Sequence, residues 1–252
     1  MAFQDGLSMQ PATQFFDAIR ASLESVQMKQ VRGAAGIVAE ALGQGMIVHT
    51  FGTGHSSLLA QELFYRAGGL AAVNPILDPR LGFECGAFES TAFERRVEGA
   101  ADLAQQAGFR AGDAGVVISN SGANPLPIEM ALLMKAAGVK VIALTNVEQS
   151  RSSASRHSSG KRLFEIADCV LDNHCPPGDA AIEIEGLPQR LGPLSTIIGA
   201  SILHAVVLEA AALLAAKGIP PATLASANVP GSSSGDLRRL TDPYRDRIRY
   251  FR

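Results

Sequence analysis

The stretch that decides the fold is residues 114–124, which read Ala114-Gly115-Val116-Val117-Ile118 and then Ser119-Asn120-Ser121-Gly122-Ala123-Asn124. The first part is an apolar run of strand length, and the second is a turn of small polar residues. Asn124 is a good N-cap and Pro125 suits the first helical position, so we expect a helix to begin here. Such a turn directs backbone N–H groups and the positive end of the helix at one spot, and its serines add hydroxyl donors. The stretch therefore predicts an anion site, above all for a phosphate.

A second turn of this kind lies earlier, at Gly52-Thr53-Gly54-His55-Ser56-Ser57, after the apolar run 46–51. It begins like a dinucleotide-binding fingerprint, but Ser57 stands where the third glycine is needed. No acidic residue ends a second strand about 20 residues further on, because Asp78 comes later, in a turn with prolines. A nicotinamide cofactor is therefore disfavoured, and no cofactor is expected. A small-phosphate loop with Gly54, Ser56 and Ser57 as contacts fits better.

Apolar runs and helix-like runs alternate from residue 46 onwards. The expected strands are 46–51, 70–76, 114–118, 139–144 and 169–171, and the expected helices are a pair within 12–43 and single ones at 57–67, 89–107, 125–137 and 194–216. This alternation predicts a parallel sheet with helices on both faces, which is a three-layer αβα sandwich of Rossmann-like or flavodoxin-like type. The polar, serine-rich residues 150–161 predict a mobile loop. We divide the chain into an N-terminal helical segment (1–45), a main domain (46–218) and a C-terminal tail (219–252).

Composition narrows the classes of partner. A net charge of −2 gives nucleic acid no electrostatic support. The longest apolar run, 197–216, contains His204 and Glu209, so no membrane span or membrane partner is expected. Three scattered cysteines predict a reducing compartment, and we expect a cytoplasmic protein. The group Asp172, His174 and Cys175 matches no standard zinc spacing, so no metal is expected.

Candidate acids and bases lie outside the two turns. Glu84 and Glu89 flank the start of the helix after the second strand, where a carboxylate can face the strand ends, and Glu62 lies in the helix after the first turn. His55 lies inside the first turn, and His204 interrupts an apolar helix, which makes both candidates for proton transfer or ligand contact. Glu94 and Glu98 share one face of the expected helix 89–107, and we expect that face to meet solvent.

The two turns together resemble those of the sugar isomerase (SIS) domain family. The shared pattern is Gly52, Gly54 and Ser56 after one strand, Ser119, Ser121 and Gly122 after another, and then Ala143-Leu144-Thr145-Asn146. With its preceding helices the chain is similar to phosphoheptose isomerases, and the string at 60–69 is similar to an uncharacterised bacterial subgroup of SIS-domain proteins.

The resemblance implies a five-stranded parallel sheet that binds a phosphosugar at the strand ends, often between subunits of a homodimer or homotetramer. It implies that Ser119, Ser121 and the backbone at Gly122 hold the phosphate and that Ser56 reaches the sugar or the phosphate. Asn120 and Asn124 belong to the same turn, although many members carry Thr or Ser where Asn124 stands. The zinc-binding residues of phosphoheptose isomerases are not recognisable here, where Leu59, Ala60 and Gln61 fall.

Three functions remain open at this point. The first is an aldose–ketose sugar-phosphate isomerase, which needs a base to move a proton between C1 and C2 and a fixed phosphate. Glu84, Glu89 or Glu62 would be that base, and His55 or His204 would open the ring or polarise an oxygen. The second is a lyase like the etherase of N-acetylmuramic acid 6-phosphate, and the third is a non-catalytic sugar-phosphate sensor.

Overall fold

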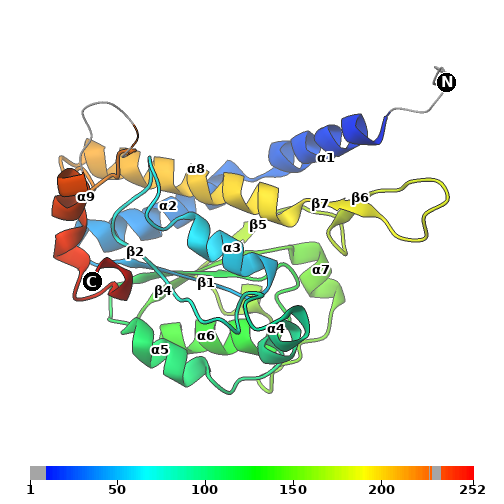
Figure 1. The fold of residues 1–252 in the computed structure, drawn as a ribbon, viewed down its shortest axis with the longest axis horizontal. Coiled ribbons are helices and arrows are strands. Elements are labelled where there is room, and N and C mark those ends of the chain that lie inside the picture. The colour runs from blue at the N-terminus through cyan, green and yellow to red at the C-terminus, as the bar shows by residue number, and fades with distance from the viewer. Residues whose placement is uncertain (1–9, 227, 229–233) are drawn as a thin grey trace.

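The computed structural model describes residues 10–226, 228 and 234–252. Its centre is a parallel sheet of five strands in the order β2-β1-β3-β4-β5 (Figure 1). The strands are β1 (Val48–Gly52), β2 (Val73–Pro75), β3 (Ala114–Ile118), β4 (Lys140–Thr145) and β5 (Cys169–Asp172). Every residue of β1 and β3 is buried, because helices cover both faces of the sheet. The prediction of a three-layer αβα sandwich is thus confirmed.

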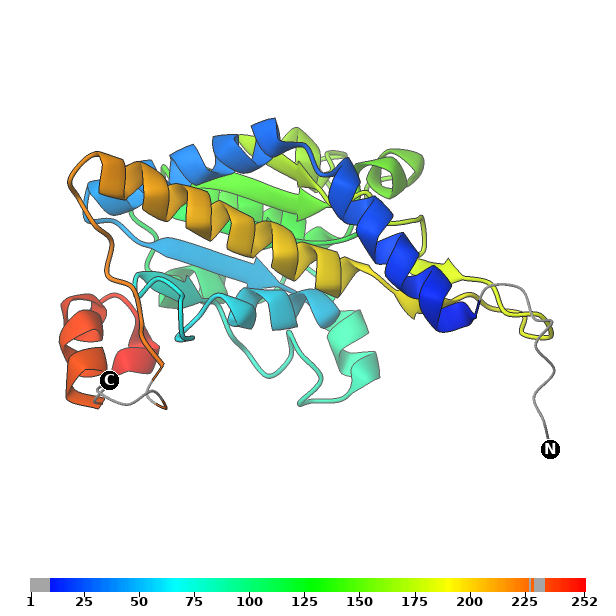
Figure 2. The same cartoon turned by 90° about the horizontal axis from the view of Figure 1, so that it is seen from above.

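Two sets of helices form the outer layers, as Figures 1 and 2 show. One face carries α1 (Pro11–Ser25), α2 (Met28–Gly43), α3 (His55–Glu62) and α8 (Ser195–Ala216), and the other carries α4 (Ala87–Glu94), α5 (Ala100–Ala107) and α6 (Pro125–Ala136). Successive strand residues point to opposite faces, so Val116 and Ile118 join the first core while Val117 joins the second. Among the described residues, α8 alone is long and apolar enough to cross a membrane by length and composition. It packs along α2 and against the sheet as a core helix.

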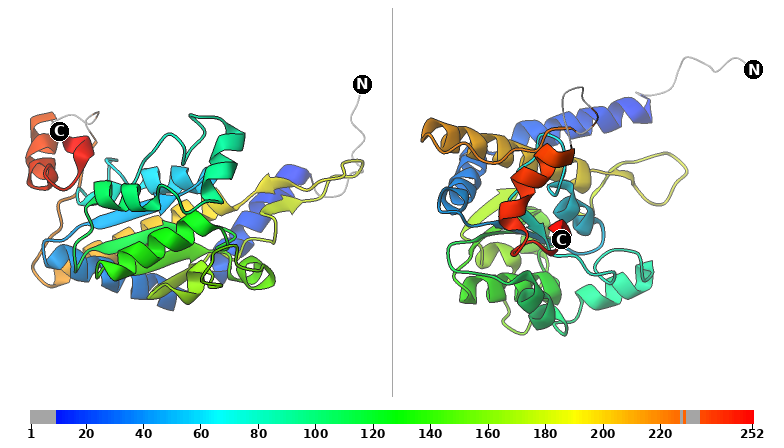
Figure 3. Two further views of the ribbon diagram at one scale, coloured as in Figure 1. Left: turned by 90° about the horizontal axis from the view of Figure 1, so that it is seen from below. Right: turned by 60° about the vertical axis from the view of Figure 1, so that its left-hand side comes forward.

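Further elements extend from this core. A helix, α7 (Val147–Ser152), follows β4, and an antiparallel hairpin of β6 (Ala180–Ile182) and β7 (Leu191–Pro193) projects from the body before α8 (Figures 1 and 3). Near the C-terminus, α9 (Ser234–Thr241) leads to two 3₁₀ turns, Asp242–Tyr244 and Arg249–Phe251. Another 3₁₀ turn, Leu163–Glu165, precedes β5.

The structure corrects several predicted elements. The helix expected at 57–67 begins at His55 and ends at Glu62, and the strand expected at 70–76 is only Val73–Pro75. The single helix expected at 89–107 is two helices, because the chain leaves the helix at Arg95 and Gly99 takes a left-handed conformation with φ +94°. The stretch 150–161 includes the end of α7, and neither the β6–β7 hairpin nor α9 was predicted.

A buried network ties the C-terminal segment to the amino-terminal end of the sheet. Asp113 has no exposed surface, and its Oδ2 accepts from Arg247 Nη2 at 2.7 Å and from His49 Nε2 at 3.1 Å. The backbone N–H groups of Arg110 and Ile47 also donate to this carboxylate, at 2.8 and 3.2 Å. These partners outweigh desolvation and lower the pKa of Asp113 to about 2. The C-terminal segment is therefore part of the folded core.

Candidate functional site

The turn after β3 lies at the carboxyl edge of the sheet, between the loops that follow β1 and β4. β3 pairs with both of these strands, so its turn takes the central place among the three loops. Ligands of open parallel sheets bind at this edge. The turn that the sequence predicts to bind an anion therefore lies at the edge where such sheets bind ligands.

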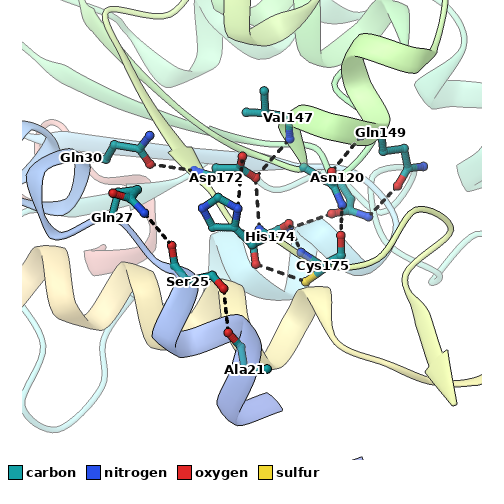
Figure 4. Close-up of polar contacts among 12 residues, drawn as sticks. Ala21, Ser25, Gln27, Gln30, Asn120, Val147, Gln149, Asp172, His174 and Cys175 are labelled. Atoms are coloured by element: carbon teal, nitrogen blue, oxygen red, sulfur yellow. Dashed lines mark hydrogen bonds and ion pairs between the residues drawn. The ribbon is translucent and has the colours of Figure 1, made fainter. Parts of the chain in front are cut away.

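Asn120 holds this turn in place. Its backbone oxygen accepts from Thr145 Oγ1 at 3.2 Å and from Asn146 N at 3.0 Å. Its side chain donates to Gln149 Oε1 at 3.3 Å and accepts from Asn173 Nδ2 at 2.8 Å. Figure 4 shows Asn120 between the residues that follow β4 and β5. Because these contacts use its side-chain groups, Asn120 positions the turn.

No side chain fits at position 122, so the turn requires glycine there. Its φ is +58°, and a Cβ there would lie 2.7 Å from Ser150 Oγ and 2.8 Å from Thr145 Oγ1. Its N–H donates back to the oxygens of Ser119, at 3.1 Å to the carbonyl and 3.2 Å to Oγ. The buried Ser150 hydroxyl has no hydrogen-bond partner in the part of the chain that the structure describes. The turn thus lies directly on the start of α7.

Several donors of this turn remain available to a ligand. Ser121 is partly exposed, and within the described ranges neither its hydroxyl nor its backbone N–H has a partner in the protein. The N–H of Ala123 has no partner there either, but Ala123 has no exposed surface. The first turn of α6 offers fewer free N–H groups to an anion than expected, because Pro125 and Pro127 carry no N–H. An anion would therefore be held mainly by the turn itself.

Arg156 brings a positive charge to this turn, which the sequence did not predict. Its N–H donates to Ala123 O at 2.9 Å, and its Nη1 donates to Asn124 Oδ1 at 2.6 Å. The neighbouring His157 is buried and lies 2.8 Å from Glu129 Oε2 on α6, which fastens the loop. Because Arg156 is otherwise exposed, its guanidinium can reach an anion bound by the turn.

The structure corrects the prediction that Glu94 faces solvent. Its Oε2 accepts from Thr53 Oγ1 and its Oε1 from Asn124 Nδ2, each at 2.9 Å. Glu98, by contrast, is exposed, because α4 ends between them. Burial raises the pKa of Glu94. Asn124 stands at the N-cap position of α6 as predicted, but its side chain bonds Glu94 and Arg156 instead of capping the helix.

The first turn is arranged differently from the second. Ser57 Oγ donates to Gly54 O at 2.7 Å, which commits the hydroxyl to the turn. Ser56 is partly exposed, and its hydroxyl has no partner within the described residues. His55 is exposed and its ring lies 4.9 Å from that of Phe83. Ser56 is therefore the better ligand contact of the two serines.

The structure joins two of the predicted acid–base residues. His204 on α8 donates through Nε2 to Glu62 Oε1 on α3 at 3.0 Å, and Arg66 also contacts that carboxylate. Burial, and to a smaller degree the charge of Arg66, lowers the pKa of His204, so the imidazole is neutral near pH 7. Glu62 lies on the same face of α3 as the exposed His55, and within the described ranges no hydrogen bond or ion pair connects the Glu62–His204 pair to the β3 turn.

Glu84 and Glu89 are both exposed, in the loop before α4 and in its first turn. No hydrogen bond or ion pair joins either of them to the two turns within the described ranges. Glu84 lines a surface pocket that also includes Ser57 of the first turn, whereas Glu94 at the end of α4 is hydrogen-bonded to residues of both turns.

Asp172, His174 and Cys175 lie together at the end of β5 (Figure 4). His174 Nδ1 is 3.6 Å from Asp172 Oδ2, and that carboxylate also accepts from Val147 N at 3.2 Å. Burial raises the pKa of the Cys175 thiol to about 12. Within the described ranges, no three His, Cys, Asp or Glu side chains are grouped as metal ligands.

With the fold and the turns defined, comparison with known proteins gives the class of protein. Residues 14–146 match the family model for the SIS domain. The match spans more than half of the chain, and the chain belongs to the SIS domain family. The resemblance predicted from the two turns is confirmed.

Full-length relatives extend this comparison. The chain is 41% identical over 238 residues to a UPF0309 protein of Geobacillus kaustophilus, covering 93% of this chain and 94% of that one. It is 43% identical over 238 residues to a UPF0309 protein of Brucella canis, covering 92% of this chain and 96% of that one. The solved phosphoheptose isomerase of Neisseria gonorrhoeae is 20% identical, with a TM-score of 0.53, and covers 78% of this chain and 94% of that chain. This last likeness shows the shared fold.

Proposed function

We propose that the chain binds a sugar phosphate, with the phosphate held by the turn Ser119–Asn124 at the carboxyl edge of the sheet. The observation that carries the proposal is a turn in which the hydroxyl and the backbone N–H of Ser121 lack partners within the described residues, beside the exposed cation of Arg156. Hydroxyls, backbone N–H groups and one guanidinium are the donors that phosphate oxygens take in proteins. The match to the SIS domain model supports the same ligand class.

Thermal denaturation with a panel of sugar phosphates tests this proposal. A ligand at 100 times its dissociation constant adds about 2.7 kcal/mol to stability, which raises the melting temperature of a chain of this size by roughly 5–10 °C. Ser121→Ala removes one hydrogen bond to a charged group and should weaken binding by about 10- to 100-fold. Ser152→Ala is the matched control, because that serine is exposed on α7. Equal shifts for wild type and Ser121→Ala would contradict the proposal.

We further propose that the protein is an aldose–ketose isomerase in which Glu62 and His204 transfer the proton. The carboxylate can take the proton from C2 and return it to C1, while the neutral imidazole moves the hydroxyl proton from O2 to O1, so that the aldose becomes the ketose with no net change in protons. The 3.0 Å contact between them supports this pair over the exposed Glu84, Glu89 and His55. In deuterated water, wild type should incorporate deuterium at C2 of the stabilising sugar phosphate, and Glu62→Gln should not.

Because Glu62 and His204 face outward, we propose that they work at an interface between two copies of the chain. The outer side of α8 carries Ile197, which is 41% exposed, and Leu208, which is 69% exposed. A helix that is apolar on its outer side as well as its inner side is usually covered on both. A homodimer or homotetramer would cover this surface and could bring the β3 turn of one copy to the acid–base pair of another.

A further inference from the structure

Glu94 is a carboxylate without an opposite charge in contact with it. Both of its oxygens accept hydrogen bonds, but the donors are the neutral side chains of Thr53 and Asn124. Within the described ranges no cation forms an ion pair with it, and the charges of Arg95 and Arg156 act on it only from a greater distance. Burial of a carboxylate against neutral donors is costly, and natural proteins keep such groups mainly where they act on a ligand.

The position of Glu94 links the two turns. Thr53 follows β1 and Asn124 closes the turn after β3, so the carboxylate lies where both loops meet at the carboxyl edge of the sheet. It remains partly exposed. A ligand that lies across the β3 turn can therefore reach it.

Asn124 separates Glu94 from the cation of Arg156. Its Nδ2 donates to Glu94 and its Oδ1 accepts from Arg156, so a single amide group lies between the negative and the positive side chain. A carboxylate only accepts and a guanidinium only donates, which fixes the orientation of the amide. The site thus has a positive side at the Arg156 guanidinium and a negative side at Glu94, on either side of the Asn124 amide.

We propose that Glu94 is a specificity-determining residue that binds a cationic amino group of the ligand, so that the preferred ligand is an amino-sugar phosphate. The inference rests on the proposed phosphate site. The phosphate would lie against the turn and Arg156, and the ammonium group would supply Glu94 with the positive charge that its protein partners lack. A neutral hydroxyl at the same place could donate a hydrogen bond but would bring no positive charge into contact with the carboxylate.

Titration calorimetry with two probes tests this inference. Glucosamine 6-phosphate and glucose 6-phosphate differ by an amino group in place of a hydroxyl, and pH 6.5 keeps the amine protonated. Wild type should bind the amino sugar about tenfold more tightly, which is the difference expected of one charged hydrogen bond. Glu94→Gln is isosteric, keeps partners for Thr53 and Asn124, and should bind both probes equally, with unchanged affinity for glucose 6-phosphate.

Two control variants and three outcomes separate this inference from the proposed function. Glu89→Gln, exposed on the same helix, should keep the preference for the amino sugar. Arg156→Ala should weaken the binding of both probes by the same factor. Equal wild-type affinity for the two probes would overturn the inference and leave the phosphate site standing. Equal weakening of both probes by Glu94→Gln would show that Glu94 only supports the loops, and this also overturns it. Binding of neither probe would overturn the phosphate site and the inference together.

Discussion

Replacing Arg247 by alanine should destabilise the whole domain, although the residue lies only five positions from the last. Its guanidinium donates to Asp113, a carboxylate with no exposed surface, at 2.7 Å. The variant leaves this charge buried with His49 and two backbone N–H groups as its remaining donors. Removal of one partner from a buried ion pair costs about 3–5 kcal/mol. Since three donors remain, we expect about 2–3 kcal/mol.

Urea denaturation at pH 7 measures this loss, and the melting temperature should fall by roughly 5–10 °C. Arg245→Ala is the matched control, because that arginine is exposed on the same segment. The pH dependence has a definite sign. The folded-state pKa of Asp113, about 2, is below its ordinary value of 3.8, so its ionised form stabilises the fold above pH 3.8 and this contribution is lost as the pH falls toward 2.

A depression of roughly two pKa units corresponds to about 2–3 kcal/mol. Arg247 causes part of that depression, so the gap in stability between wild type and Arg247→Ala should narrow below pH 4. A gap of the same size at pH 7 and at pH 3 would refute the role given to the ion pair. No loss of stability at pH 7 would show that the C-terminal segment is not part of the core.

Two further substitutions test the turn and the outer face of α8. Gly122→Ala should lower the free energy of unfolding, measured by urea denaturation, by about 1–3 kcal/mol more than Gly160→Ala does. Both glycines have positive φ, but only at Gly122 would a Cβ meet neighbouring atoms. Equal losses of stability would count against the close packing of the turn. Leu208→Asp should shift the protein toward monomer in analytical ultracentrifugation, because Leu208 is exposed on the outer side of α8. The control Lys217→Asp, at the end of α8, should not. An unchanged mass for Leu208→Asp would place the interface elsewhere.

The sheet and its turns could be predicted because their signals are local. An apolar run followed by Ser119-Asn120-Ser121-Gly122 needs no knowledge of the rest of the chain, and the turn indeed lies at the carboxyl edge of the sheet. The boundaries of α3 and β2 were less accurate, because the apolar residues that follow α3 pack against the C-terminal segment, for example Phe64 against Tyr250 and Phe251. Such packing is tertiary and leaves no periodic signal.

The missing parts of the site depended on such tertiary effects. Glu94 was expected to face solvent because helix periodicity was extended through Arg95, where α4 in fact ends. If Gly99 had been taken as a break in this helix, Glu94 and Glu98 would not have been assigned to one helix face. The exposure of Glu94 would then have stayed undecided. Arg156 stands in a serine-rich stretch with no regular pattern, and only its hydrogen bonds to Ala123 O and Asn124 Oδ1 place it at the turn.

The sequence could not predict that Glu62 and His204 contact each other. They are 142 positions apart and meet only because α3 packs on α8. Each was a candidate by residue type alone. Within the described ranges no hydrogen bond joins them to the β3 turn, and this makes the arrangement of subunits part of the proposed chemistry.

The central claim is that the turn after β3 binds phosphate, and backbone amide NMR with inorganic phosphate tests it most directly. Phosphate is the group common to all sugar phosphates, so the measurement does not depend on the identity of the sugar. We predict saturable shifts of the amide signals of Ser121, Gly122 and Ala123 in wild type, and much smaller shifts in Arg156→Ala. Unchanged signals from these amides, or saturable shifts confined to other parts of the chain, would contradict the account.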